Sequence, residues 1–166
     1  GWYKLFEGNT GSGYEPLFCI SDSSTDRILV MHENSSISTR PLKCWYGNDT
    51  SGWSFHVSSR VRQLNKWMFF ALRHTKADNQ MKLYGFDGET FDSGYRIGAA
   101  SDLNPTFTNN INIGYWSGHR ATGQFRDYGF VLKALTDAEI ERLAKGMMSQ
   151  TKEKVYISNM IREKVL

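Results

Sequence analysis

Acidic, histidine and cysteine side chains are the first candidates for chemistry in this chain. Retaining glycoside hydrolysis needs two carboxylates about 5 Å apart, which one face of a strand can supply. Glu89 and Asp92 flank a predicted hairpin without the third acid of an alternating acidic strand, and Cys19 lacks a context typical of a nucleophile. The histidines lack the close spacing of metal ligands: His32, His56, His74 and His119. We therefore predict that the protein is not an enzyme.

Two polar loops carry the side chains best suited to binding. One loop ends in Trp53, and the other contains Tyr115, Trp116, His119 and Arg120. Sugar recognition combines an aromatic face, placed under the apolar side of a pyranose, with a few amide, hydroxyl or guanidinium partners. These five residues are therefore the predicted ligand-binding residues. The alternative is that the three aromatic residues cap the ends of the folded domain as part of its core.

Short strands are the elements that must position these loops. Residues 67–72 form an apolar run that is rich in aromatics and too short for a core helix, which favours a buried strand. Residues 81–86 predict a second strand, and Asp87-Gly88 suits a two-residue hairpin turn with positive φ. The pattern therefore predicts a hairpin over residues 81–94.

Further strands and one helix follow along the chain. Residues 110–113 carry apolar side chains at odd positions, which predicts a strand with one solvated face. Residues 125–132 predict another strand. Thr136 and Glu139 form a capping box for a short helix that is expected to stop near Gly146.

The order of these segments resembles the laminin-G-like domain of the concanavalin A-like lectin and glucanase superfamily. The resemblance is carried by residues 66–72, 83–89, 112–114, 123–128 and 135–140. It departs at Phe86, where two residues stand in place of one, and a one-residue bulge would absorb the difference. The family implies an all-β, two-sheet antiparallel jelly-roll sandwich with one short helix near residues 137–146. It also implies binding of sugars or proteins rather than catalysis.

The resemblance carries two further expectations about ligands and partners. Members of the family often hold calcium at the rim with carboxylates and carbonyls, which makes calcium a candidate ligand, although no cofactor is required. The candidate calcium ligands are weak and match no specific motif: Asp22, Asp26, Asp49 and Asp102. In the family a strand or two precede the segment matched by Trp2-Tyr3. We therefore hypothesise that another polypeptide completes the edge of the sandwich.

Length and charge are those of one domain with a tail. A chain of 166 residues can bury a full core, and residues 1–146 are predicted as the laminin-G-like domain. Residues 147–166 are predicted as a C-terminal extension that packs on the domain or joins a partner. The net charge is only +3, which argues against a nucleic-acid groove. No apolar stretch approaches the roughly 20 residues of a membrane span.

The cysteines and glycosylation triplets bear on location. Cys19 and Cys44 are predicted on the outer two strands of a three-stranded meander, about 9.5 Å apart, which is too far for a disulfide. We therefore predict free thiols. Asn34 and Asn48 begin triplets of the glycosylation acceptor pattern. Such triplets add only slightly to the expectation that the protein is extracellular. An extracellular, cell-surface or virion-associated protein is favoured.

Three predicted strands are apolar on both faces, at residues 17–20, 28–31 and 67–72. A sandwich strand with one solvated face should alternate, so the outer faces are expected to be covered by the tail, by missing sequence or by another protein. Two functions follow. The first is a lectin-like module that recognises carbohydrate or protein at its loop rim. The alternative is a structural jelly roll that mediates protein–protein assembly within a larger complex, such as a surface fibre or virion.

Overall fold

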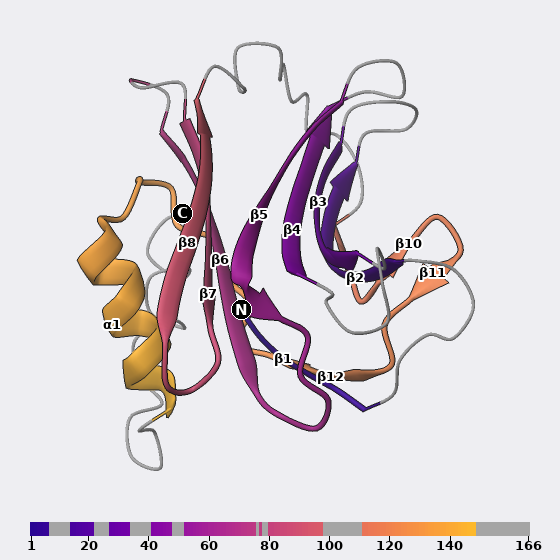
Figure 1. Ribbon diagram of the computed structural model, residues 1–166. Coiled ribbons are helices and arrows are strands. Elements are labelled where there is room, and N and C mark those ends of the chain that lie inside the picture. The colour runs from indigo at the N-terminus through magenta and orange to yellow at the C-terminus, as the bar shows by residue number, and fades with distance from the viewer. Residues whose placement is uncertain are drawn as a thin grey trace, which may run out of the picture.

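The computed structural model describes residues 1–6, 14–21, 27–33, 41–47, 52–75, 77, 80–97 and 111–148. Within these residues the chain is mostly β, with two five-stranded antiparallel sheets, a small hairpin and one helix (Figure 1). No helix in this part of the chain is long and apolar enough to cross a membrane. The extension predicted at 147–166 lies outside the described residues, apart from the last two residues of the helix.

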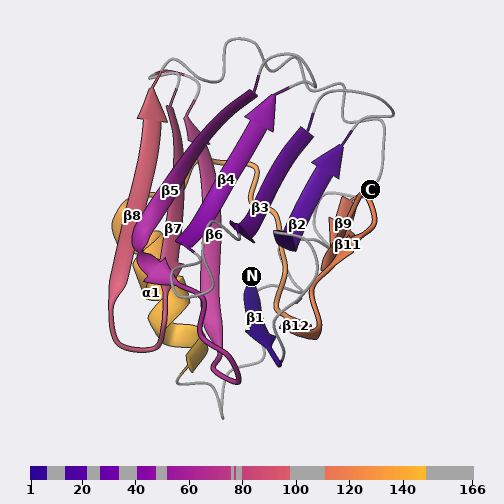
Figure 2. The same cartoon turned by 45° about the vertical axis from the view of Figure 1, so that its right-hand side comes forward.

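Each sheet is built from antiparallel neighbours. The first sheet has the order β12-β1-β6-β7-β8, with β1 Trp2–Leu5, β6 Met68–Thr75, β7 Gln80–Phe86, β8 Phe91–Ile97 and β12 Gly123–Arg126. The second sheet has the order β5-β4-β3-β2-β9, with β2 Tyr14–Ser21, β3 Arg27–Glu33, β4 Pro41–Gly47, β5 Gly52–Val61 and β9 Ile111–Ile113. Figure 2 shows the second sheet side by side with the small hairpin of β10 Tyr115–Trp116 and β11 His119–Arg120. The prediction of an all-β protein with antiparallel sheets and one short helix is confirmed at this level.

The main core lies between the two sheets. Alternate side chains of each strand point inward, as period-2 strands require: Val30 and Leu42 come from the second sheet, and Tyr3, Met68 and Leu83 come from the first. All five are almost fully buried. Burying apolar area of this kind is the dominant favourable term in folding.

The outer face of the first sheet is covered by the helix α1, Asp137–Met148 (Figure 1). Ile140 and Ala144, one turn apart, pack against Phe69 and Tyr84 in a second buried cluster. Phe69 therefore faces the helix while its neighbour Phe70 faces the main core. A helix of the same chain thus covers the outer side of the two-sided apolar pattern of residues 67–72.

The outer face of the second sheet is covered in part by the β10–β11 hairpin. Cys19, Leu29 and Met31 form a buried cluster on this face, and Trp116 from the hairpin and Trp45 from β4 pack against it. The outer sides of the two-sided strands at residues 17–20 and 28–31 are therefore also covered in part by the chain itself.

The strand meander that carries the cysteines agrees with the sequence prediction. β3 lies between β2 and β4, so one strand separates Cys19 from Cys44. Cys19 belongs to the outer cluster and Cys44 to the main core, so the two thiols lie on opposite faces of the sheet. Both are free and buried, and burial raises the pKa of the Cys44 thiol far above its usual range.

The β7–β8 hairpin forms where the sequence predicts it, but its turn differs. The strands pair without a shift from Gln80 opposite Ile97 to Phe86 opposite Phe91, so no bulge forms at Phe86. The predicted two-residue turn is wrong, because four residues, 87–90, connect the strands. The Asp87 carboxylate accepts hydrogen bonds from the backbone N–H groups of Glu89 and Thr90 and so holds the longer turn.

Two predicted element boundaries also move, and one predicted strand differs in its exposure. β12 ends at Arg126 instead of continuing to residue 132, because Asp127 takes a φ of 55° that a strand cannot accommodate. α1 runs past Gly146 to Met148. β9 is a strand, but Ile111 and Ile113 are exposed although they pair with the inward-facing Ile20 and Phe18. The alternation of residues 110–113 predicts that the isoleucine side chains are buried, and the structure leaves them exposed.

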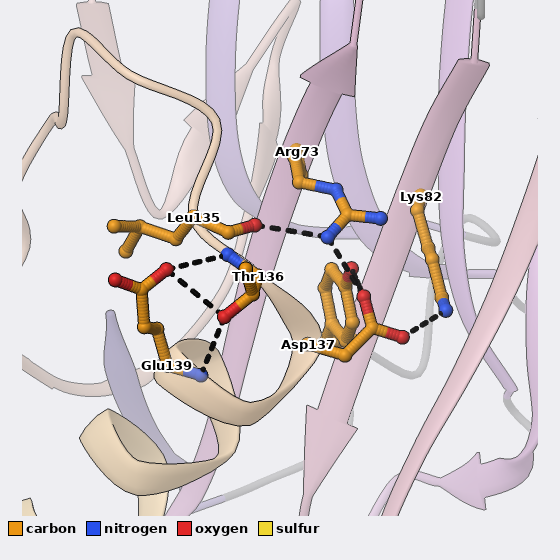
Figure 3. Close-up of polar contacts among 7 residues, drawn as sticks. Arg73, Lys82, Leu135, Thr136, Asp137 and Glu139 are labelled. Atoms are coloured by element: carbon orange, nitrogen blue, oxygen red, sulfur yellow. Dashed lines mark hydrogen bonds and ion pairs between the residues drawn. The ribbon is translucent and has the colours of Figure 1, made fainter.

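The start of α1 is fixed to the first sheet through Asp137 (Figure 3). Its carboxylate accepts hydrogen bonds from Arg73 of β6 at 2.7 Å and from the Tyr84 hydroxyl of β7 at 2.8 Å, and it pairs with Lys82. These contacts hold the pKa of Asp137 at about 2, with the Lys82 hydrogen bond as the largest cause. Burial, and then the hydrogen bond to Asp137, raises the pKa of Tyr84, so its hydroxyl stays a donor.

The capping box predicted for this helix is present (Figure 3). The Glu139 carboxylate accepts the Thr136 backbone N–H at 2.7 Å, and the Thr136 hydroxyl accepts the Glu139 N–H at 3.2 Å. Arg73 also donates to the carbonyl of Leu135, the residue before the cap, at 2.9 Å. The segment that enters α1 is therefore held to β6 by backbone and side chain together.

Replacing Asp137 with Asn is expected to lower the free energy of unfolding by about 1 kcal/mol at neutral pH, because the charged acceptor is lost at a half-exposed site. The folded-state pKa of about 2 lies below the ordinary 3.8. The stabilisation is therefore present above about pH 4 and is lost as the pH falls through about 2. Denaturant unfolding followed by tryptophan fluorescence measures this at neutral pH and from pH 4 to 2.

The matched control for this experiment is Glu141→Gln, which removes the exposed pair with Lys145 one turn along α1. Its expected cost is below about 0.5 kcal/mol. A stability gap between wild type and D137N that stays constant down to pH 2 would show that the carboxylate does not fix the helix.

Candidate functional site

Four of the predicted ligand-binding residues lie together on the β10–β11 hairpin. Tyr115 pairs with Arg120, and Trp116 pairs with His119. The two turn residues, Ser117 and Gly118, both have positive φ, at 45° and 85°. Positive φ at both central positions is the signature of a type I′ turn, which matches the twist of a two-residue hairpin.

The inner side of the hairpin anchors it to the sheet. Trp116 and His119 stack with ring centroids 5.4 Å apart, and Tyr14 of β2 meets both rings edge-on. Trp116 also packs against the outer cluster around Leu29. Trp116 therefore fits the alternative prediction that the aromatic residues pack as part of the core, because its ring contacts other side chains of the protein.

The outer side of the hairpin presents Tyr115 and Arg120. The Tyr115 side chain is 42% exposed. The guanidinium of Arg120 lies 5.9 Å from the centre of its ring, at the distance of a cation–π contact. The Gly118 N–H donates to the Tyr115 hydroxyl at 3.3 Å. These two residues are the part of the predicted site that an external ligand can reach.

Trp53 does not join the hairpin. It lies in β5 opposite Tyr46, at the end of the second sheet that also contains Ile28 and Ile20. The hairpin contacts Tyr14 at the other end of β2, six residues away, which corresponds to about 20 Å along a strand. The two predicted loops therefore belong to opposite ends of the sheet, and the Trp53 side chain lies outside the described residues.

The predicted calcium ligands, Asp22, Asp26, Asp49 and Asp102, all lie outside the described residues. Within the residues that the structure does describe, no group of three or more His, Cys, Asp or Glu could hold a metal ion. Of the acids flanking the β7–β8 hairpin, Glu89 is mostly exposed beside Lys66, and Asp92 accepts the backbone N–H of Ser93.

A groove of about 500 Å³ lies beside β6, and nothing in the sequence pattern predicted it. The groove reaches from Phe18 and β9 across β6 to Leu143 of α1, and residues 127–135 form its remaining wall. Several of its lining side chains are large, apolar and exposed, with Leu132 the most exposed at 94%: Ile111, Ile113, Phe130, Val131 and Leu132. Exposed apolar groups gathered in a concave site are typical of a binding surface.

One edge of β6 borders this groove. Gly1 and Phe70 exchange two backbone hydrogen bonds, of 2.8 and 3.0 Å, where β1 pairs with β6. Backbone groups on one edge of an antiparallel strand belong to every second residue, so those of Leu72 point to the same side as those of Phe70. Among the described strands, none pairs with this side of β6 beyond Phe70. The β1–β6 ladder therefore stops where the groove begins.

Gly1 and Tyr128 close the head of the groove. A Cβ atom added to Gly1 would lie 2.7 Å from the Tyr128 ring, so the backbone and the ring are in close contact. Burial lowers the pKa of the Gly1 α-amine from 8.0 to about 5, and the Asp127 carboxylate opposes that shift.

The sequence contains a signal of this groove that is visible only in retrospect. Phe130, Val131 and Leu132 form an apolar run, which the sequence analysis assigned to a continuing strand. The run is instead exposed and without strand structure, because β12 has already ended at Arg126. An apolar run after a strand-breaking residue is thus compatible with a groove wall as well as with a strand.

No protein-family model, no curated protein and no solved structure matches this chain. The resemblance to laminin-G-like domains therefore stays a prediction.

The two faces of the hairpin predict opposite effects of mutation. Trp116→Ala is expected to cost about 2 kcal/mol of stability, because it removes a half-buried ring from the outer cluster. Tyr115→Ala should change stability by less than about 0.5 kcal/mol, because the residue is exposed and belongs to none of the three buried clusters. Urea unfolding of both variants measures this. Equal destabilisation by the two changes would contradict the assignment of Trp116 as the anchor.

Proposed function

We propose that this protein is a non-catalytic binding module that holds an extended segment of another polypeptide in the groove beside β6. The observation that carries the proposal is the meeting of the β6 edge at Leu72, which pairs with none of the described strands, with a groove lined by exposed apolar side chains. Addition of a strand to an open sheet edge is a common mode of peptide recognition, in which backbone hydrogen bonds supply affinity and side-chain pockets supply specificity.

The distribution of apolar surface supports this site over others. The described outer faces of both sheets have cover from the chain itself, from α1 and from the hairpin. The groove side chains remain exposed. Leu132 in particular, at 94% exposure, contributes almost no hydrophobic burial to the stability of the isolated chain. Transfer of apolar surface from water contributes about 25 cal/mol per Å², so a partner that covers these side chains gains binding free energy.

The proposal also covers the domain family and the kind of assembly in which the protein acts. We assign the chain to the laminin-G-like jelly rolls, supported by the order of the β6 strand, the β7–β8 hairpin, β12 and the capped helix. Such a domain would act within a larger assembly, as the binding of a strand from another polypeptide implies.

A peptide array tests the proposed function. Arrayed 12-residue peptides, attached by either end, are probed with labelled protein, and the wild type should retain a subset of apolar peptides. Leu132→Asp should lower that binding at least tenfold, because it places a charge on the groove wall. Tyr95→Asp is the matched control, since Tyr95 is an exposed aromatic on β8, away from the groove. Binding that is absent, or that is unchanged in L132D, would contradict the proposal.

Carbohydrate binding is the second candidate, and one observation favours it. Tyr115 offers an exposed ring with the Arg120 guanidinium beside it, which is the combination that sugar recognition uses. A glycan array with and without calcium is the test. This candidate predicts bound glycans whose signal falls at least tenfold in Tyr115→Ala and is kept in Leu132→Asp. An array with no Tyr115-dependent signal would remove it.

A further inference from the structure

We infer that the partner segment adds a strand to the first sheet and inserts a row of large apolar side chains between the two sheets, onto Ile111 and Ile113 of β9. This inference rests on the proposed function and specifies the sequence of the occupant. The two isoleucine residues are thereby assigned as the residues that select the partner.

Ile111 and Ile113 have the register of core residues but are not buried. Ile111 pairs with Ile20 and Ile113 with Phe18, whose side chains pack in the main core. Directly opposite residues of an antiparallel pair lie on the same face of the sheet, yet the two isoleucine residues are 53% and 44% exposed. The residues that the structure describes therefore cover the inner face of β9 much less than they cover Val30 of the same sheet, which is fully buried.

A strand beside β6 would supply the cover that β9 lacks among the described residues. In a sandwich, the inner side chains of one sheet are covered by a second sheet about 10 Å away. The groove joins Ile111 and Ile113 to Leu72 of β6. The Leu72 backbone groups on this side pair with none of the described strands. A strand added at Leu72 would therefore continue the first sheet over β9.

Both faces of such a strand would be buried. Leu72 packs against the main core and Ala71 against the cluster under α1. Successive side chains of a strand point to opposite faces. One row of partner side chains therefore meets Ile111 and Ile113, and the other meets Leu143 of α1, which lines the same groove and is 38% exposed. Strands buried on both faces are near-continuous apolar runs.

The charges along the groove call for no charge on the partner. The arginine, lysine and aspartate side chains that line it form ion pairs within the chain: Arg73 with Asp137, Lys133 with Glu139 and Asp127 with Arg126. A charge on the partner would lose water without a new counter-charge from these groups, which is costly. Since β6 lines the groove over residues 69–74, the fitting partner is an uncharged run of about five apolar residues.

Fluorescence anisotropy with two labelled peptides tests the burial of both faces. Both peptides have blocked ends. One has the central sequence Val-Ile-Val-Ile-Val, and the other has Thr-Ile-Thr-Ile-Thr, which is apolar on one face only. Threonine is β-branched like valine and also favours strands, so the two peptides differ mainly in polarity. We expect the first to bind at least tenfold more tightly, and equal binding would overturn the inference.

A variant of β9 tests which residues select the partner. Ile111→Asp should weaken binding of the valine peptide at least tenfold, because it places a charge under the inner row. Ile111 is exposed in the free protein, so folding should be retained, and urea unfolding checks this. Tyr95→Asp is the matched control and should leave binding unchanged. Unchanged binding in I111D would overturn the inference.

Nuclear Overhauser effects between the wild-type protein and the valine peptide need no variant. Alternate peptide residues should contact the methyl groups of Ile111 and Ile113, and the residues between them should contact those of Leu143. Contacts from the peptide to one of these walls only would overturn the inference, whatever the stability of I111D.

The remaining outcomes separate this inference from the proposed function. Peptide binding that depends on Leu132 but makes no contact with Ile111 would overturn this inference, while the polypeptide-binding function stands. No binding of any peptide would overturn both. Contacts of the Ile111 methyl groups with other residues of this chain, without peptide, would assign the groove to the chain itself. A dimer that I111D dissociates would assign it to a second copy. Either result would overturn the inference.

Discussion

The contact between Asp137 and the first sheet is the constraint on which the rest of the structure depends. Three side chains of β6 and β7 converge on one carboxylate at the first residue of α1, and Arg73 also holds the carbonyl of Leu135 (Figure 3). The helix is thereby fixed over the outer face of the sheet. The segment before it, residues 127–135, is held beside β6 as a wall instead of pairing with it. The groove exists because this wall stands off from the edge of β6.

The sandwich and the groove together explain where the chain leaves apolar surface exposed. Cover from α1 and from Trp116 means that side chains such as Phe69 and Leu29, on opposite outer faces, are buried. At β9 and at residues 130–132 the cover is missing, although these side chains are as apolar as the core. Burial within the chain gives no reason for apolar side chains at these positions. A bound strand explains it, because such a strand would use the β6 edge and both rows of exposed side chains at once.

The sequence predicts those parts of the structure that depend on local chemistry. The capping box at Thr136, the β7–β8 hairpin and the cysteine-bearing meander follow from spacing and turn residues, and all three are present. The groove depends on how residues 127–135 pack beside β6, which is a matter of contacts between segments far apart in the sequence. The separation of Trp53 from the hairpin is likewise set by the strand order of the second sheet. The periodicity of a single segment does not predict the groove or the position of Trp53. For this reason the residues of both loops were predicted as one site.

A hydrogen bond between the Leu72 amide and a bound strand is the most direct test of the account. Protein labelled with nitrogen-15 is mixed with a peptide labelled with carbon-13 at its carbonyls, and the scalar coupling across the hydrogen bond is measured by NMR. The account predicts a coupling from the Leu72 nitrogen to one peptide carbonyl, since the amide faces the groove. A peptide that is bound, with its contacts elsewhere and no coupling at Leu72, would contradict the claim that β6 accepts a strand.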